Sequence, residues 1–254
     1  MRAMCRACCV TLRMGIRLHM SNADSLPVLF IPGLADSPRL YQAQLPRIYR
    51  VGPVMVADHT RDESIAGIAT RVLAHAPPRF ALVGLSMGGY TALEIMRRAP
   101  ERVLKLALLN TSARPDTPDA IERRLGAIAA SERGEYRTIT ENLFPNVVHP
   151  SHAQDEALKR AYVDMHLSVG AEAFVRQQRA IIGRIDSRPS LAAIRCPTLV
   201  LVGDADKITP REHAEELAQG IPGAELRVID TCGHLSALEQ PEAVSEALLA
   251  HLTR

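Results

Sequence analysis

The sequence predicts an α/β fold in which helices cover both faces of a mostly parallel, doubly wound sheet. Short strand-like runs alternate with helix-like segments, which is typical of parallel strands linked by crossover helices. The expected strands are apolar almost throughout, as strands buried on both faces are. One long helical stretch interrupts the alternation, which predicts a helical cap inserted between two strands.

The first half of the core is expected to contain three strands, with one helix between the second and third strands and another after the third. Residues 26–32 (LPVLFIP), 54–57 (VMVA) and 80–84 (FALVG) are short apolar runs that predict buried strands. Over 64–76, apolar residues recur at helical spacing, and the serine that begins this segment is a typical N-cap. A second helix is expected over 87–99, because a proline directly after it would end it.

The second half begins with a further strand at 103–109 and then changes character. Over 111–189 no strand-like run occurs, and the stretch is helical, polar-rich and broken by several prolines and glycines. The alternation then resumes, with strands expected at 197–203 and 225–229 and helices expected at 210–219 and 241–252. We therefore expect a core of residues 21–110 and 190–254, with residues 111–189 forming a helical cap.

Length and composition exclude several classes of protein. A chain of 254 residues with 47% hydrophobic and 23% charged residues fits one large globular domain and argues against disorder. No apolar run approaches the roughly 18–20 residues that span a bilayer. The net charge of +2 is a poor match to nucleic-acid binding, which usually requires a basic face. A small-molecule substrate is the expected partner, with the chain a monomer or a homodimer and neither nucleic acid nor membrane involved.

The basic balance comes from a short N-terminal extension, residues 1–20. It holds four arginines and no acid, so residues 21–254 carry 26 − 28 = −2. Its arginines interrupt any apolar core of the length that a secretory signal needs. Three interpretations compete: an upstream start codon chosen in error, with Met14 or Met20 the true start; a short extra strand or tail; or a metal or lipid site.

The cysteines do not form a disulfide framework. Cys5, Cys8 and Cys9 cluster in the extension without a nearby partner pair, so they do not make a tetrahedral zinc set. Cys196 and Cys232 are isolated, and the total of five is odd. In the absence of an export signal we expect the reducing cytoplasm as the compartment.

The segment 84–88, Gly-Leu-Ser-Met-Gly, carries the strongest chemical signal. It has the G-x-S-x-G pattern and lies between a predicted strand and a predicted helix, as a nucleophile elbow does. Such a turn lifts Ser86 above the sheet edge, and Gly84 and Gly88 avoid the clashes that larger side chains would cause. Because a helix begins directly afterwards, the Met87 amide is placed to bind an oxyanion. The alternative is an ordinary loop with a capping serine.

A nucleophilic serine needs a base, and the base needs an acid. His234 follows the last predicted strand, at the sheet edge where doubly wound folds place their sites. Asp204 and Asp206 follow the strand at 197–203 on the same edge. Asp204 is closer to the strand end, whereas Asp206 can reach across the loop; the residues alone favour Asp206 without excluding Asp204, and the acid that is not used would be a turn or cap residue.

The order Ser86, Asp206, His234 is the one expected of an α/β-hydrolase. The segments GLSMGGY, PTLVLVGDADKITP and CGHLSALEQPEAV together resemble α/β-hydrolase-fold proteins of the small carboxylesterase and enol-lactonase type. The resemblance covers about residues 26–110 and 190–252. It implies that Asp206 is the triad acid, and that the turn Ile-Pro-Gly-Leu provides the second oxyanion amide at Leu34.

Two departures from that family stand out. Pro32 replaces the usual histidine before the glycine of the oxyanion turn, so we expect a different local hydrogen-bond arrangement to hold this turn. The loop 57–64 (ADHTRDES) lacks the glycines common at that place, which could reshape the rim of the pocket. Because the oxyanion donors are backbone amides, neither departure excludes activity.

The resemblance implies a carboxylesterase: a serine hydrolase that cleaves carboxylic esters through an acyl-enzyme and needs neither metal nor organic cofactor. The alternatives are a lactonase, thioesterase, peptidase, perhydrolase or C–C bond hydrolase on the same triad, or a weakly catalytic ligand-binding protein. The pocket is expected between the sheet edge and the cap. Its weaker candidate lining residues are Leu235, Phe144, Tyr162 and Met165, each of which could equally belong to the core.

Overall fold

The computed structural model describes residues 25–254; the N-terminal extension, with Cys5, Cys8 and Cys9, lies outside the described residues. Six strands form one sheet, in the order β2-β1-β3-β4-β5-β6, and every neighbouring pair is parallel. All six predicted strands are present. Their bounds are β1 Val28–Ile31, β2 Val54–Val56, β3 Phe80–Leu85, β4 Val103–Leu109, β5 Thr198–Gly203 and β6 Glu225–Ile229.

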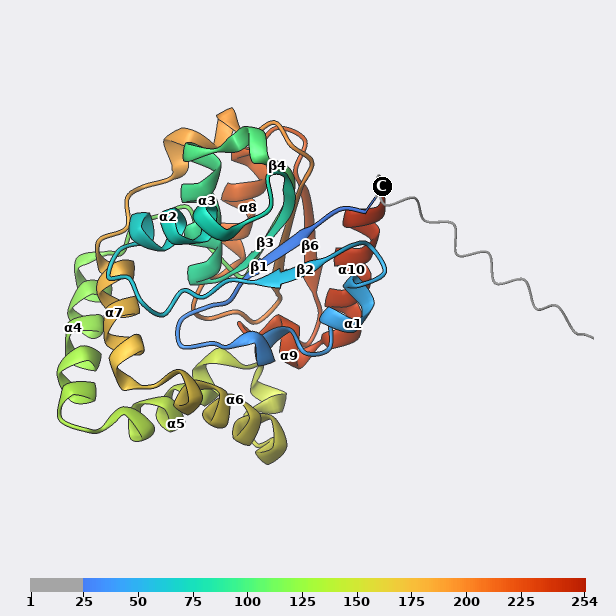
Figure 1. Ribbon diagram of the computed structural model, residues 1–254. Coiled ribbons are helices and arrows are strands. Elements are labelled where there is room, and N and C mark those ends of the chain that lie inside the picture. The colour runs from blue at the N-terminus through green and yellow to red at the C-terminus, as the bar shows by residue number, and fades with distance from the viewer. Residues whose placement is uncertain (1–24) are drawn as a thin grey trace, which may run out of the picture.

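Helices cover both faces of the sheet (Figure 1). Alternate residues of each strand point to opposite faces, so Leu29 and Ile31 of β1 join one buried cluster while Val28 and Phe30 join another. The first cluster packs against α2 (Ile65–His75), α3 (Met87–Arg98) and α8 (Arg211–Gly220). The second includes residues of α1 (Leu45–Ile48) and α10 (Pro241–Thr253). The sheet is therefore doubly wound, as the apolar strands predict.

Four longer helices are inserted between β4 and β5 and lie together at the left and bottom of Figure 1. They are α4 (Pro118–Glu132), α5 (Tyr136–Val147), α6 (Glu156–Val169) and α7 (Ala171–Ile182). We call them the helical insertion. They occupy the stretch predicted to be helical, while the assignment of residues 111–189 as a separate cap remains a prediction.

The elements that were not predicted from the sequence are all short. These are α1, α9 (Ser236–Glu239) and four 3₁₀ turns, at Pro38–Tyr41, Pro100–Arg102, Pro150–His152 and Arg188–Ala193. Elements of three to six residues complete too little of a helical period to be recognised by apolar spacing. Each 3₁₀ turn has a proline in its first two positions, where the fixed φ of proline favours a turn.

The parallel register brings the carboxyl ends of the strands to one edge. Leu85 pairs with Leu109, and Gly203 pairs with Ile229, so the segments that follow these four strands begin side by side. This is the edge at which open α/β sheets place ligands. Among residues 25–254, no helix is both long enough and apolar enough to cross a membrane.

Candidate active site

Ser86 lies in a sharp turn between β3 and α3. Its backbone adopts φ 53° and ψ −116°, a conformation that L-residues rarely take. A Cβ on Gly84 would overlap the carbonyl oxygen of Gly88, and one on Gly88 would overlap that of Ile31. The two glycines of the motif are therefore required sterically, as the sequence pattern predicts.

The end of β4 and the segment after it fix this turn. The Ser86 amide donates to the carbonyl oxygen of Leu109 at 2.9 Å, and the Thr111 hydroxyl donates to the Ser86 carbonyl oxygen at 2.7 Å. Gly89 allows the helix to approach Thr111, because a Cβ at this position would overlap the threonine side chain. The strained serine is thus held by surrounding hydrogen bonds and close packing.

Ser86, His234 and Asp206 form a continuous hydrogen-bonded network. His234 Nε2 lies 2.9 Å from Ser86 Oγ, and His234 Nδ1 lies 2.9 Å from Asp206 Oδ2. Since a carboxylate accepts, Nδ1 carries the proton, and Nε2 of the neutral ring is left to accept from the serine hydroxyl. The three side chains come from the loops after β3, β5 and β6, and all three residues are buried.

Asp206 is held by donors in addition to His234. Its Oδ2 accepts from Asn110 Nδ2 at 2.9 Å and from Thr209 Oγ1 at 2.8 Å, while its Oδ1 accepts from the amides of Ile208 and Thr209. Burial favours the neutral acid, but the attraction of His234 and these hydrogen bonds lower the pKa of Asp206 below its ordinary value. The carboxylate is therefore ionised at neutral pH.

The interaction with Asp206 also shifts the pKa of His234. Burial disfavours the imidazolium, but the charge and hydrogen bond of Asp206 outweigh it and raise the pKa of His234 above 6.5. A base whose conjugate acid is stabilised in this way is suited to accept a proton from a hydroxyl near neutral pH.

Asp204, the other aspartate of the loop after β5, has different hydrogen-bond partners. It accepts from the amides of Thr231 and Cys232 at 3.0 and 2.9 Å and so ties the loop after β5 to the loop that carries His234. Thr231 has φ 53°, which marks a tight turn at that point. Asp204 acts as a turn residue, the role the sequence analysis left for the acid outside the triad.

The helical insertion supports the His234 loop. The carbonyl oxygen of Val147, at the end of α5, accepts from the amides of His234 and Leu235 at 2.9 and 3.2 Å. Glu239 accepts from the Gly233 amide at 2.9 Å and from the His149 amide at 2.6 Å. Glu239 was not predicted from the sequence, because no local pattern marks a glutamate whose carboxylate accepts hydrogen bonds from neighbouring loops.

The turn after β1 packs against Ser86. A Cβ on Gly33 would lie 3.4 Å from Ser86 Cβ, so the backbone of this turn borders the serine side chain. Within residues 25–254, neither the Leu34 amide nor the Met87 amide has a hydrogen-bond acceptor. The turn that borders Ser86 therefore contains one amide without an acceptor among these residues, at Leu34, and the first residue of α3, Met87, provides another.

Two side chains that the sequence analysis did not single out hold this turn. His59 Nε2 lies 2.8 Å from the Gly33 carbonyl oxygen, which requires the ring nitrogen to donate. Gln177 of α7 accepts from the Ala35 amide at 2.8 Å and donates to the His59 carbonyl oxygen at 3.2 Å. The signals in the sequence were indirect: Pro32 in place of a histidine, and an unusual loop at 57–64 that contains His59.

A second buried carboxyl group, Asp36, lies in the same turn. Its Oδ1 has no hydrogen-bond partner among the described residues, and His166 Nδ1 is 4.0 Å away. Burial raises the pKa of Asp36 to about 7, although the charge of His234 and the Gly33 amide act in the opposite direction. Asp36 was not predicted from the sequence, because an acid in a loop is ordinarily exposed to solvent.

The four weaker pocket candidates are deeply buried. Leu235, Phe144, Tyr162 and Met165 are each at most 3% exposed and belong to the core cluster shared by the sheet and the helical insertion. The Tyr162 hydroxyl has no hydrogen-bond partner among the described residues. Their assignment to a substrate pocket remains a prediction.

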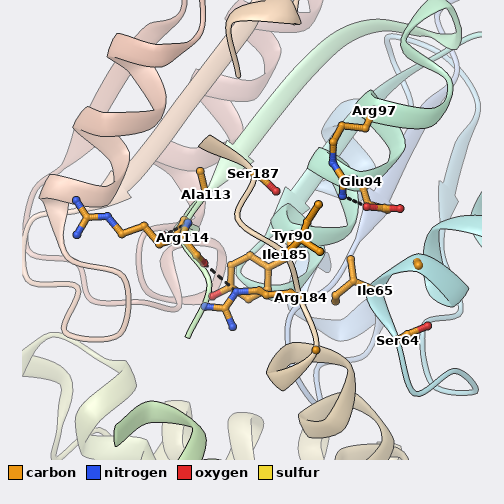
Figure 2. Close-up of a pocket in the computed structure, with 13 residues that line it drawn as sticks. Ser64, Ile65, Tyr90, Glu94, Arg97, Ala113, Arg114, Arg184, Ile185 and Ser187 are labelled. Carbon is orange, nitrogen blue, oxygen red and sulfur yellow. Dashed lines mark hydrogen bonds and ion pairs between the residues drawn. The ribbon is translucent and has the colours of Figure 1, made fainter. Parts of the chain in front are cut away.

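A cavity of about 140 Å³ lies between α2, α3 and the segment that leaves the helical insertion (Figure 2). None of the three triad-like residues lines it. Its charged groups are already paired: Glu94 with Arg97, and Arg184 with Asp116 at 2.8 Å, while the Arg184 guanidinium stacks 4.3 Å from the centre of the Tyr90 ring. We assign no ligand to this cavity. Within residues 25–254, no three His, Cys, Asp or Glu side chains are grouped as metal ligands.

Two relatives match most of this chain. A Variovorax paradoxus protein named as a candidate carbamate hydrolase, RutD, is 28% identical over 250 residues, which cover 91% of this chain and 93% of that protein. A pimeloyl-[acyl-carrier protein] methyl ester esterase of Klebsiella pneumoniae is 30% identical, covering 75% of this chain and 76% of that protein.

Two solved structures are also similar to this chain. A thermophilic esterase from Thermogutta terrifontis has a TM-score of 0.83 at 30% identity, with 90% of both chains covered. The enol-lactonase of Burkholderia xenovorans LB400 shares the fold, with a TM-score of 0.82 at 21% identity and coverage of 91% of this chain and 92% of that one. Residues 28–247 match the alpha/beta hydrolase family model, and the chain belongs to this family.

Proposed function

We propose that the protein is a serine hydrolase that cleaves carboxylic esters through an acyl-enzyme. The observation that carries the proposal is the unbroken network from Ser86 Oγ through His234 to Asp206. The Leu34 and Met87 amides, which have no acceptor among the described residues, are the oxyanion donors in this proposal. Two relatives at 30% identity bear the name esterase, which supports the ester as the bond cleaved.

The first half-reaction forms the acyl-enzyme. His234 Nε2 takes the hydroxyl proton as Ser86 Oγ bonds to the ester carbonyl carbon, and the carbonyl oxygen becomes an oxyanion. The oxyanion accepts hydrogen bonds from the two free amides, and the positive end of α3 adds to its stabilisation. His234 then donates the proton to the leaving alkoxide as the C–O bond breaks, which releases the alcohol.

The second half-reaction releases the acid. His234 removes a proton from water, the resulting oxygen attacks the acyl carbon, and the same amides hold the second oxyanion. Collapse returns the proton to Ser86 Oγ and frees the carboxylic acid. Each oxyanion donor is worth on the order of 10²–10³ in rate. Leu85 and Met87, on either side of Ser86, and Leu235, after His234, are apolar, so a modest acyl or alkyl group suits the site better than a charged one.

The proposal is tested with p-nitrophenyl esters of increasing acyl length, on wild type, Ser86→Ala and Ser245→Ala. Ser245 is a matched control, because it is a fully buried serine in α10 that only donates to the Pro241 carbonyl oxygen. We expect a burst of p-nitrophenol and a length optimum in wild type and Ser245→Ala, and a loss of at least about 10³-fold in Ser86→Ala.

Equal turnover by wild type and Ser86→Ala would contradict the nucleophile assignment. If no ester is turned over but a fluorophosphonate still modifies Ser86, the triad would be active on another acyl group, such as a lactone, thioester or carbamate. Failure of both reactions, with tight ligand binding, would identify a binding protein.

A further inference from the structure

Two buried side chains fix the peptide units on both sides of Leu34. His59 donates to the Gly33 carbonyl oxygen, which belongs to the same peptide unit as the Leu34 amide. Gln177 accepts from the Ala35 amide, which belongs to the next peptide unit. Gln177 also donates to the His59 backbone, so the three contacts close into one network. His59 is 2% exposed and Gln177 is fully buried.

This arrangement determines where the Leu34 N–H points. In a trans peptide the carbonyl and the amide hydrogen point in opposite directions within one plane. Holding the Gly33 carbonyl oxygen toward His59 therefore turns the Leu34 N–H to the other side. Ala35 has φ 57°, a conformation that is unfavourable for alanine and needs support from its surroundings. Without that support, the turn would adopt backbone conformations of lower energy.

The support comes from two separate parts of the chain. His59 belongs to the loop after β2, and Gln177 to α7 in the helical insertion. Burial lowers the pKa of His59, despite its hydrogen bond to Gly33, so the ring is neutral and its single proton lies on Nε2. The insertion packs on the turn through Tyr136 and Phe174, which contact Ala35, and it hydrogen-bonds to the turn through Gln177, whose donor and acceptor are both used.

We propose that His59 and Gln177 are positioning residues that aim the Leu34 amide at the reacting oxyanion, so that the helical insertion sets the activity of the core. The inference rests on the proposed function, because it assigns the Leu34 amide to an oxyanion. Neither side chain touches the substrate in this scheme; both act through the backbone. Displacing α7 would release the Ala35 amide and let the turn relax.

The test compares two neighbouring glutamines of α7. Gln177→Met removes the contact to the turn with little change in volume. Gln178→Met is the matched control, because Gln178 is also buried but accepts from Arg124 of α4 at 2.7 Å. His59→Phe removes the support from the other end of the network. For each variant, the melting temperature, kcat, KM and the rate at which a fluorophosphonate modifies Ser86 are measured.

We expect Gln177→Met and His59→Phe to lower kcat and the phosphonylation rate by about 10- to 100-fold, with KM changed less than threefold. A lost oxyanion donor is worth up to about 10³-fold, and a turn that has loosened loses part of that. Gln178→Met should melt at a lower temperature but react within twofold of wild type. Rates within twofold of wild type in folded Gln177→Met and His59→Phe would overturn the inference.

Hydrogen–deuterium exchange provides a readout that does not depend on turnover. The peptide that contains residues 33–37 should exchange faster in Gln177→Met and His59→Phe than in wild type or Gln178→Met. Unchanged exchange there would overturn the coupling even in an active enzyme. An inactive wild type whose Ser86 does not react would instead refute the proposed function, and the exchange data would still decide whether α7 holds the turn.

Discussion

Two buried aspartates lie on loops at the same sheet edge, and both interact electrostatically with His234. Asp206, after β5, has donors on both carboxylate oxygens, and its pKa is lowered. Asp36, after β1, has one oxygen without a partner, and burial raises its pKa to about 7. Burial alone therefore does not decide the charge of a carboxyl group; the opposite charge and the hydrogen-bond donors around it also contribute.

The largest expected difference between the two lies in catalysis. Asp206→Asn should lower kcat by about 10³- to 10⁴-fold, because an amide nitrogen facing Nδ1 favours the tautomer whose Nε2 cannot accept the serine proton. Asp36→Asn should change kcat less than tenfold. Steady-state hydrolysis of the best p-nitrophenyl ester checks both. A similar loss in both variants would mean that the two carboxyl groups act on His234 as a pair.

The next difference is in stability. The pKa of Asp36 rises from its ordinary 3.8 to about 7 on folding, so its contribution to the free energy of unfolding is lost as pH rises between these values. The full loss is on the order of 4 kcal/mol, at 1.36 kcal/mol per pH unit. Asn cannot ionise, so Asp36→Asn should gain stability relative to wild type between pH 4 and pH 8. Urea unfolding at both pH values measures this, and a constant difference would contradict the raised pKa.

The smallest effect tests the donors around Asp206. Thr209→Val removes the 2.8 Å hydrogen bond from the hydroxyl to Asp206 Oδ2 and keeps the shape of the side chain. With three other donors besides His234 in place, we expect kcat to fall by roughly two- to tenfold, as for the loss of about 1 kcal/mol. Thr253→Val is a matched control, because that hydroxyl only donates to the Leu249 carbonyl oxygen at the end of α10. An unchanged kcat in Thr209→Val would show that the hydroxyl is dispensable.

Local sequence patterns were sufficient for the sheet and for the principal residues of the candidate site. Apolar runs predicted all six strands, and the turn at 84–88 required its glycines because Ser86 adopts a backbone conformation with no room for side chains beside it. The position of His234 after the last strand was informative because parallel strands end at one edge. Asp206 was separated from Asp204 mainly by resemblance, and the structure shows the physical difference between them in their hydrogen-bond partners.

The sequence by itself thus determined the fold class, the nucleophile turn and the order of the candidate triad, since each is recognised from short segments whose patterns are local and from the order of those segments along the chain. Only the tertiary structure decided how the β1 turn is held and which carboxyl groups are left without donors. Gln177 meets Ala35 across 142 positions, and Asn110 meets Asp206 across 96. No periodicity or local motif encodes such contacts, because they arise only when strands and the helical insertion have packed around the same edge of the sheet.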